Sequence, residues 1–477
     1  MYDVAVIGAG VVGAMIAREL AAYKLNICIL EKEHDVAMGA TKANSAIVHA
    51  GFDAKEGSLK AKLNVKGSKM MENVTHELGV KYRRNGSLVV GFNEEDRVTL
   101  ETLLERGKTN GVEGLEIIER DRLTVLEPNI ADGVKCALYA PTGAIVCPYE
   151  LTVAAIGNAM DNGAKLKCSF PVTTITAHED FYEISSGNDT VKARFIVNAA
   201  GVYSDAVARM IGDDTFTVHP RRGEYLVLDK ECGNTVSHTI FMTPSKMGKG
   251  ILVSPTVDNN LLLGPTAVDT VDKDDKSTTP EFFTSIFDIA AKTVKNIPRN
   301  KTITSFCGLR AVGDTGDFII TSPREHFINA AGIESPGLSA SPAIAEYVRE
   351  LLGSDGLKLE KKEDHVRTRR PMHAFREANI DEKNRMIKEN PAYGRIVCRC
   401  EGVTEGEILD AIRTNPRATD LDGVKRRTRA QMGRCQGGFC SPYIIELLSR
   451  ELDIPYENVT KFGGESNVAL GKTKEDK

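Results

Sequence analysis

The sequence contains no run of about 18 or more apolar residues, which a membrane-spanning helix would need. It also lacks a basic excess, because 61 Lys and Arg residues stand against 66 Asp and Glu residues, whereas a general nucleic-acid binder shows clustered positive charge. No basic segment precedes the strand-like residues 2–7, so a secretory signal is not expected. We therefore expect a cytoplasmic protein with no nucleic-acid partner and no transmembrane segment, with peripheral docking to a membrane left open.

The ten cysteines do not form the framework of a small disulfide-rich domain, so reduced thiols or a metal site are expected. Of the 477 residues, 42% are hydrophobic and 27% charged. Such a chain is long enough, and apolar enough, for about three folding units with buried cores.

The first motif is a strand, a glycine turn, a helix and a second strand. Residues 4–7 are continuously apolar, as in a parallel strand covered on both faces, and Gly8, Gly10 and Gly13 follow with GxGxxG spacing. Gly8 permits the tight turn, Gly10 lets the backbone approach a pyrophosphate, and Gly13 allows the helix to pack closely. Glu31 ends the second strand, where a carboxylate binds a ribose hydroxyl pair. Together these features predict a dinucleotide site, and the alternative is a packed turn with purely structural glycines.

Three later segments resemble flavin-contacting motifs of the FAD-dependent oxidoreductases of the D-amino-acid oxidase superfamily. Residues 41–52 resemble the segment that runs past the pyrophosphate and along the isoalloxazine ring, and residues 196–205 resemble the second flavin motif. Residues 332–339 precede a helix expected at 342–352, whose N-terminus in the family points at the flavin N1–C2=O edge and stabilises negative charge there. The resemblance implies FAD as the cofactor. The binding residues that it adds are Thr41, Lys42, Asn44, Ser45, Val172, Ala200, Gly201, Gly337, Leu338 and Ser339.

Three positions in the core are candidate catalytic residues. His49 resembles the histidine that glycerol-3-phosphate and L-2-hydroxyglutarate oxidases place beside the flavin, where a neutral imidazole removes the hydroxyl proton as hydride leaves the adjacent carbon. Arg310 matches the family arginine that holds the anionic end of the substrate. Lys246 lies in a glycine-containing loop and adds positive charge for a phosphate. The alternatives are a core histidine, a domain-bridging arginine and a solvated lysine.

The C-terminal part contains two close cysteine pairs, Cys398 with Cys400 and Cys435 with Cys440. Two such pairs suit a small tetrahedral-sulfur centre. Zinc is the first alternative, although its usual C-x2–4-C spacing differs from C-x-C, and free structural cysteines are the second. The segment resembles the bacterioferritin-associated-ferredoxin-like [2Fe-2S] domain, which anaerobic-type glycerol-3-phosphate dehydrogenases carry after their core. The resemblance implies a [2Fe-2S] cluster held by these four thiolates. The basic residues expected to offset its negative charge are Lys425, Arg426, Arg427, Arg429 and Arg434.

The expected fold class is α/β plus α+β, with a Rossmann-like FAD-binding domain, an antiparallel-sheet substrate domain and a small helical C-terminal iron–sulfur domain. Short strands separated by polar turns predict the antiparallel sheet, and helices are expected at 59–78 and 148–162. The core is expected at 1–352, followed by a charged, solvated linker at 353–393, the [2Fe-2S] domain at 394–457 and a tail at 458–477. Within the core, the FAD-binding domain is assigned to about 1–80, 148–215 and 301–352, and the substrate domain to about 81–147 and 216–300.

These features, with the two resemblances, imply an FAD-dependent dehydrogenase that oxidises sn-glycerol 3-phosphate to dihydroxyacetone phosphate. Electrons then pass through the [2Fe-2S] centre to a partner acceptor protein or a second oxidoreductase subunit, since an enzyme that discharges directly to oxygen needs no such centre. Two alternatives stay open. The substrate could instead be L-2-hydroxyglutarate or another 2-hydroxy acid, or the chain could be a non-catalytic electron-transfer subunit that holds both cofactors.

Overall fold

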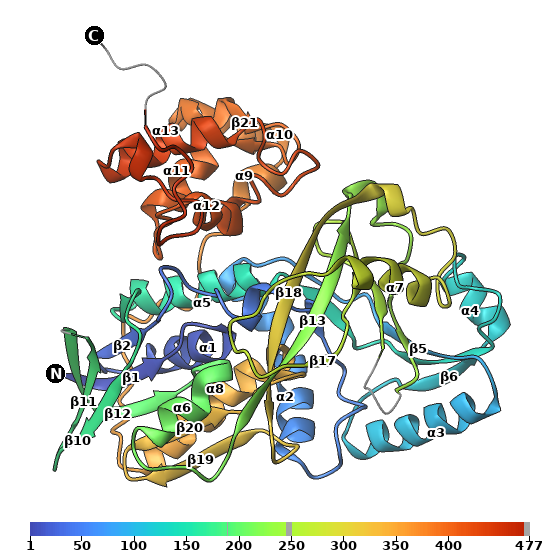
Figure 1. Ribbon diagram of the computed structural model, residues 1–477, viewed down its shortest axis with the longest axis horizontal. Helices are drawn as coiled ribbons and strands as arrows, with labels where there is room; N and C mark the ends of the chain where they lie inside the picture. The colour runs from blue at the N-terminus through green and yellow to red at the C-terminus, as the bar shows by residue number, and fades with distance from the viewer. Residues whose placement is uncertain (188, 245–249, 472–477) are drawn as a thin grey trace.

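The computed structural model describes residues 1–187, 189–244 and 250–471 (Figure 1). Its first sheet is mixed and has a parallel centre. β1 (Tyr2–Ile7) pairs in parallel with β2 (Ile27–Leu30) and with β12 (Asp189–Asn198). β2 and β12 pair in parallel, in turn, with β9 (Lys165–Lys167) and β20 (Phe327–Ala331). Antiparallel pairing adds β10 (Thr174–Ala177), β11 (Tyr182–Ser186) and β19 (Ile319–Arg324).

Helices cover this sheet, which explains why its central strands are apolar throughout. α1 (Val11–Leu20) packs against α5 (Pro148–Asp161) and α8 (Gly337–Ser354), and α8 also packs against α2 (Leu59–Leu78). Val6, Ile16 and Ile344 are among the buried residues that join these helices to the sheet in one hydrophobic core. The short helix α6 (Ser204–Arg209) follows β12.

The second sheet has nine strands and is antiparallel except for one pair, as expected for the substrate domain. It also includes residues 302–313, which the sequence prediction assigned to the FAD-binding domain, and this is a correction. Its strands, in order, are β17 (Val268–Asp269), β13 (Val218–Leu228), β16 (Leu261–Gly264), β15 (Leu252–Pro255), β14 (Thr239–Met242), β5 (Ser87–Gly91), β7 (Cys136–Ala140) and β6 (Glu116–Glu119), with β18 (Thr302–Gly313) paired to β13. The exception is β14, which runs parallel to β5. α3 (Glu94–Thr109), α4 (Arg120–Leu126) and α7 (Pro280–Ala290) pack against these strands.

A small three-stranded sheet connects the two parts of the core. It contains β3 (Ile47–Val48), β8 (Ala144–Val146) and β4 (Tyr82–Arg83). β3 lies inside the segment expected to run along the flavin, and it also contacts α8, so this segment is held between the small sheet and α8.

The helix expected at 342–352 begins earlier, at Gly337, and this is a correction to the sequence prediction. Pro342 has no N–H to donate to the carbonyl of Leu338, and a proline in this position normally ends or kinks a helix. The hydroxyl of Ser341 donates to that carbonyl instead, at 2.9 Å. The helix therefore continues through Pro342, and its N-terminus lies five residues closer to the glycine-rich segment before it.

The C-terminal unit is small and mainly helical and lies next to α5 (Figure 1). It contains β21 (Ile396–Cys398), β22 (Val403–Thr404), α11 (Glu405–Arg413), α12 (Leu421–Thr428) and α13 (Ser441–Leu452), which share one hydrophobic core. Thr404 and Glu407 form a reciprocal capping box at the start of α11. No helix in the described part of the chain is both long and apolar enough to cross a membrane.

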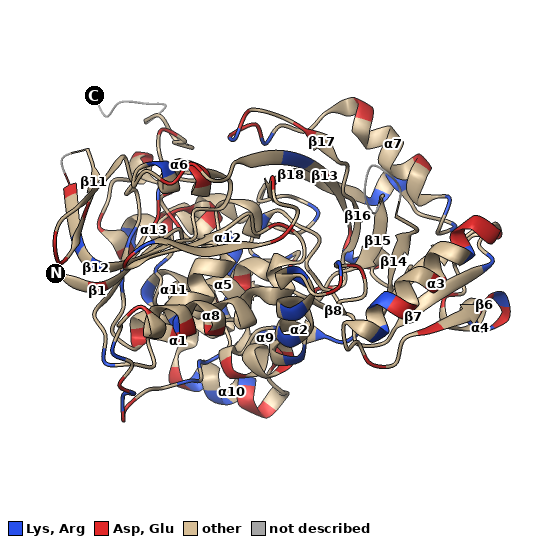
Figure 2. Ribbon diagram, turned by 90° about the horizontal axis from the view of Figure 1, so that it is seen from below, with Lys and Arg blue, Asp and Glu red and all other residues tan. Residues whose placement is uncertain are grey.

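The segment before this unit is less solvated than the sequence suggests. It forms α9 (Ala374–Glu377) and α10 (Ile380–Glu389), and Phe375 is buried against Met386 and Tyr393. The buried His373 lies 2.7 Å from Glu150 of α5. α10 carries charged residues of both signs, as α3 does (Figure 2). The segment therefore fastens the C-terminal unit to the core.

Candidate functional site: a dinucleotide cavity and a cysteine cluster

A cavity of about 1210 Å³ extends from the glycine turn to the second sheet. Small-molecule pockets usually measure about 300–1,000 Å³, so this cavity has room for a dinucleotide together with a small substrate. Among the predicted residues, those that line it are Gly8, Gly10, Glu31, Thr41, Lys42, Asn44, Ser45, His49, Val172, Ala200, Gly201, Arg310, Gly337 and Leu338. Gly13 and Ser339 do not line it. Lys246 lies outside the described residues.

The glycine turn is as tight as the motif requires. Gly8 has φ +106°, and a Cβ there would lie 2.4 Å from the carbonyl oxygen of Ala199 at the end of β12. A Cβ on Gly13 would lie 2.0 Å from the carbonyl oxygen of Gly8. α1 therefore packs directly on the turn. Gly13 does not line the cavity, but it allows the close contact that fixes the position of Gly8.

This packing gives a first prediction. We expect Gly13→Ala to weaken FAD binding by roughly tenfold to a hundredfold, because overpacking costs about 1–3 kcal/mol and displaces the turn. Gly133→Ala is the matched control, since Gly133 does not line the cavity and the nearest atom to its added Cβ, on Phe92, lies 3.9 Å away. Flavin titration of the apoproteins measures both affinities. Equal affinities for the two variants would contradict the proposed role of the turn.

Polar side chains hold the backbone around the turn. Glu31 accepts hydrogen bonds from the N–H groups of Ala9, at 2.8 Å, and Glu33, at 3.0 Å. Burial raises the pKa of Glu31. Thr41, in a short 3-10 helix (Ala40–Lys42), accepts from the N–H of Val11 at 2.9 Å. Gly10 provides no side-chain cap for α1, so the positive N-terminal end of the helix faces a cavity of dinucleotide size. The residues present therefore fit FAD.

The far end of the cavity contains the candidate catalytic residues. The N–H of His49 donates to Ser339 Oγ at 2.7 Å, and its Nε2 lies 3.4 Å from Ser335 Oγ. The imidazole lies next to the Phe241 ring, with 5.9 Å between centroids. Ser339 thus fixes the backbone of His49 from α8, which explains how a residue outside the cavity contributes to the site.

Arg310 lies on β18, opposite Arg221 of β13. Arg221 pairs with Asp269 at 2.6 Å, whereas no carboxylate pairs with Arg310 among the residues that the structure describes. A half-buried guanidinium without a carboxylate partner is suited to an anionic ligand. β18 passes close to the flavin segment, since a Cβ on Gly308 would lie 1.9 Å from the carbonyl oxygen of Ala43.

Tyr225 was not predicted from the sequence. Its hydroxyl lies 3.1 Å from Ser45 Oγ, beside Arg310, and its ring stacks on Phe306. Burial raises the pKa of this hydroxyl. Strand alternation from Gly223, which also packs near Arg310, would have placed Tyr225 on the cavity side of β13.

The four predicted cluster cysteines come together in the C-terminal unit. Cys400 Sγ lies 3.5 Å from Cys435 Sγ, and a hydrogen bond with Cys440 lowers the pKa of Cys398. The pKa of Cys435 is also lowered. Burial alone would raise it, but hydrogen bonds from Cys400 and from the backbone N–H groups of Gly437 and Phe439 have the larger effect. A Cβ on Gly433 would lie 2.3 Å from Cys400 Cβ, so the loop closes tightly around the thiols.

Four thiols with backbone donors directed at sulfur fit an iron–sulfur cluster. Within the described ranges, no group of three or more His, Cys, Asp or Glu residues is arranged to hold a single metal ion. The individual ligand assignments stay a prediction from the motif.

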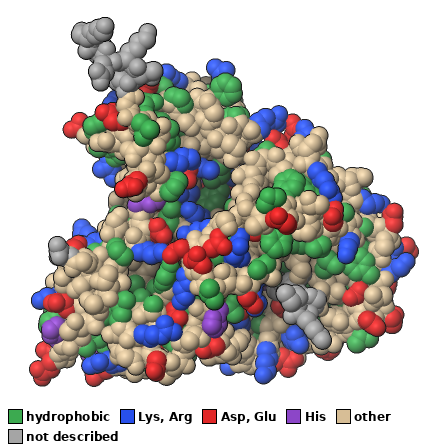
Figure 3. Space-filling view, in the orientation of Figure 1, with side chains coloured by type: hydrophobic (Ala, Val, Ile, Leu, Met, Phe, Trp, Pro, Cys, Tyr) green, Lys and Arg blue, Asp and Glu red, His purple; other side chains and the backbone are tan. Residues whose placement is uncertain are grey.

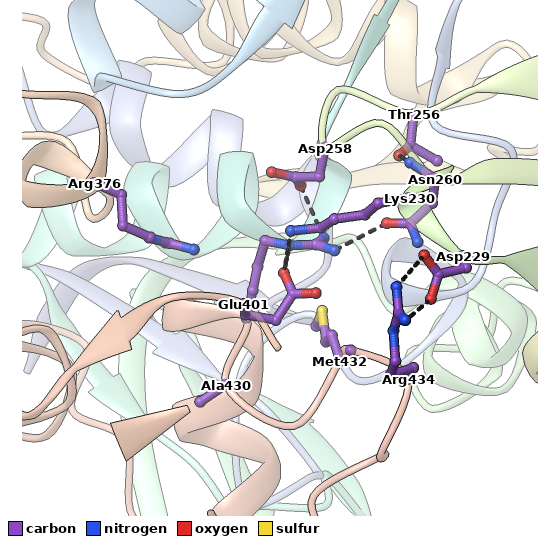
Figure 4. Close-up of polar contacts among 12 residues, drawn as sticks. Asp229, Lys230, Thr256, Asp258, Asn260, Arg376, Glu401, Ala430, Met432 and Arg434 are labelled. Carbon is purple, nitrogen blue, oxygen red and sulfur yellow. Dashed lines mark hydrogen bonds and ion pairs between the residues drawn. The ribbon is translucent and has the colours of Figure 1, made fainter. Parts of the chain in front are cut away.

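The basic residues expected around the cluster mostly pair with carboxylates. Arg429 contacts Asp258 at 2.8 Å and Glu401 at 3.0 Å, and Lys230 also contacts Glu401 (Figure 4). Arg434 pairs with Asp229 and Glu231 of the core. Met432 lies between these two groups, and the hydroxyl of Tyr149 contacts its sulfur at 3.5 Å. These arginines therefore join the cluster domain to the core. Beside this junction, Figure 3 shows a hollow with Lys and Arg side chains at its rim.

Comparison with known proteins agrees with this geometry. Residues 3–351 match the FAD dependent oxidoreductase family, and residues 396–450 match the BFD-like [2Fe-2S] binding domain. A glycerol 3-phosphate dehydrogenase from Caloramator mitchellensis is 48% identical over 100% of both chains. An L-2-hydroxyglutarate dehydrogenase from Nematostella vectensis is 31% identical over 56% of this chain and 62% of its own.

Among solved structures, the dithionite-reduced L-alpha-glycerophosphate oxidase from Mycoplasma pneumoniae with FAD bound has a TM-score of 0.73 and is 32% identical. The match covers 77% of this chain and 98% of that one. The two cofactors expected from the sequence, FAD and a [2Fe-2S] cluster, are confirmed by these matches. The chain belongs to the FAD dependent oxidoreductase family.

Proposed function

We propose that this protein is a cytoplasmic FAD-dependent dehydrogenase that oxidises sn-glycerol 3-phosphate to dihydroxyacetone phosphate. The observation that carries the proposal is that His49 and Arg310 line one cavity of dinucleotide size. Arg310 has no carboxylate partner among the described residues, whereas its neighbour Arg221 pairs with Asp269. The full-length similarity to a glycerol 3-phosphate dehydrogenase favours this substrate over a 2-hydroxy acid.

When bound, FAD supplies a two-electron hydride acceptor and the [2Fe-2S] cluster supplies a one-electron carrier. The protein's own contribution is to bind, orient and deprotonate. Arg310 holds the phosphate through bidentate hydrogen bonds, which fixes the carbon that loses hydride. His49 accepts the hydroxyl proton at a ring nitrogen, and its backbone hydrogen bond to Ser339 keeps the ring in place. The buried Tyr225 and the Phe241 ring limit the water around the reacting atoms.

Anaerobic flavin bleaching tests the substrate. The purified protein is mixed, without oxygen, with sn-glycerol 3-phosphate, with its enantiomer and with L-2-hydroxyglutarate. We expect rapid loss of flavin absorbance with sn-glycerol 3-phosphate alone. Bleaching by the hydroxy acid alone would replace the proposed substrate, and the absence of bleaching by any member of the panel would contradict the dehydrogenase.

We also propose that electrons leave through the cluster to an acceptor protein. Cys400 is exposed, and the side chain of Phe439, next to Cys440, is 86% exposed. Phe439 thus gives a protein partner an apolar contact beside the cluster ligands.

The cluster ligands are tested by Cys400→Ser. We expect this variant to lose most of its iron and the electron paramagnetic resonance signal of the reduced cluster, because a hydroxyl is a poor ligand for iron in such a centre. Cys136→Ser, which changes a buried thiol on β7, is the control and is expected to keep both. Full iron content in Cys400→Ser would remove Cys400 from the ligand set.

A further inference from the structure

The cluster domain is attached directly to a wall of the dinucleotide cavity. The loop at 31–39 follows β2, and Glu31, Lys32, Glu33 and Gly39 of this loop line the cavity. The opposite side of the same loop contacts α12, the helix that precedes the loop containing Cys435 and Cys440.

Asp35 is the centre of this attachment. Arg427 donates to both of its carboxylate oxygens at 2.8 Å, and Arg426 donates to Oδ2 at 2.6 Å. All three side chains are buried. Arg427 also donates to the carbonyl oxygens of Pro416 and Gly423, so its guanidinium is fixed within the cluster domain. The two arginines hold the pKa of Asp35 well below its usual range, against the effect of burial.

Neighbouring contacts hold the same two elements together. His34 Nε2 lies 2.7 Å from a carboxylate oxygen of Asp420, whose other oxygen accepts from the N–H of Gly423 and caps α12. Gly463, in the segment after α13, packs against His34, since a Cβ there would lie 2.3 Å from the ring. The loop at 31–39 therefore contacts the cluster domain at two residues, His34 and Asp35, and the side chains around Asp35 are all buried.

The attachment continues to the glycine turn. The N–H of Val36 donates to Asp35 at 2.8 Å, and the N–H of Ala37 donates to the carbonyl oxygen of Ala9 at 3.0 Å. The N–H of Ala9 donates to Glu31. Ala9 lies between Gly8 and Gly10. The loop that contains Asp35 therefore binds both the N–H and the carbonyl group of the residue at the centre of the glycine turn.

Charge adds to the mechanical link. Lys42 of the cavity wall lies near Arg426 and their positive charges repel, while Asp422 and Glu33 offset part of this repulsion. Burial, with the charges of Arg426 and Lys276, lowers the pKa of Lys42 to about 8. The two negative charges of a dinucleotide pyrophosphate would relieve this repulsion.

Both ends of α12 support the cluster loop. The N–H of Ala430 donates to Thr428 Oγ1 at 3.1 Å, and the side chain of Gln431 donates to the carbonyl oxygen of Leu421 at 3.2 Å. Both residues lie at the start of the loop that contains Cys435. A displacement of α12 would therefore move this loop as well as the loop at 31–39.

We propose that α12 is a structural part of the FAD site, and that FAD binding and cluster retention are energetically coupled through Asp35 and Arg427. Such coupling is reciprocal: each cofactor raises the affinity for the other by the same factor. The inference rests on the two cofactors and not on the proposed substrate. Its test uses no substrate, so its failure would leave the proposed activity in place.

The first test compares two arginine variants of the full chain. Arg427→Met removes one of the two buried arginine partners of Asp35, and Arg413→Met removes an exposed arginine that pairs with Glu451 inside the cluster domain. We expect the dissociation constant of FAD, from flavin titration of the apoproteins, to rise by about tenfold or more in Arg427→Met, within the usual range of coupling between sites. We expect a change of less than about twofold in Arg413→Met.

The second test uses the wild-type chain and stays decisive if Arg427→Met does not fold. Iron release to a chelator is followed in FAD-stripped protein and in protein saturated with FAD. We expect FAD to slow the release by about tenfold, because differences in affinity appear mostly in the dissociation rate. Equal release rates, or an unchanged affinity for FAD in a folded Arg427→Met variant, would overturn the proposal.

Discussion

Arg310→Ala is expected to lower kcat/KM for sn-glycerol 3-phosphate by about a thousandfold, or roughly 4 kcal/mol, mainly through KM. Two charge-assisted hydrogen bonds to the phosphate would be lost. Steady-state kinetics with an artificial acceptor, combined with the substrate dependence of flavin bleaching, separate the effect on KM from the effect on kcat.

The neighbouring strand offers a matched control. Arg221 is the register partner of Arg310 but pairs with Asp269, so Arg221→Ala is expected to change kcat/KM by less than about threefold. Arg310→Lys keeps the charge without the planar fork and should recover only part of the loss. Unchanged kinetics in Arg310→Ala would assign the phosphate to another cationic residue of the cavity lining.

His49→Ala is expected to slow flavin reduction by about 10²–10⁴-fold, the usual contribution of a general base. Without His49, no side chain would accept the substrate's hydroxyl proton as hydride leaves the adjacent carbon. Flavin content and the substrate concentration for half-maximal bleaching should change little, because Arg310 still holds the phosphate. Single-turnover mixing without oxygen measures the reduction rate directly.

A comparison of the Arg310 and His49 variants tests their roles more strictly than either variant alone. Loss of Arg310 should act on substrate binding, and loss of His49 on the rate at saturation. His219→Ala, which alters an exposed histidine of β13, controls for general damage to the sheet. A His49→Ala variant that is reduced at the wild-type rate would assign the proton to another group.

Local motifs predicted a large part of this molecule. The spacing of Gly8, Gly10 and Gly13 has a steric cause within a few residues, since a Cβ at Gly13 meets the carbonyl of Gly8. The capping box of Thr404 and Glu407 is likewise closed over four residues. The start of α8 was misplaced because Pro342 normally marks a helix boundary, while the compensating hydroxyl of Ser341 carries no comparably strong signal.

The amino-acid sequence by itself located the two cofactor sites, because the glycine turn and the two cysteine pairs present backbone geometry and sulfur donors encoded over short spacings. The resemblance to known families then implied FAD and a [2Fe-2S] cluster at these sites. Only the tertiary structure decided what the basic residues of the C-terminal domain contact. Arg427 and Asp35 are separated by 392 residues along the chain, yet they form a buried ion pair. The partner of a charged side chain depends on which surfaces meet when the domains pack, and no local pattern of charge specifies that meeting.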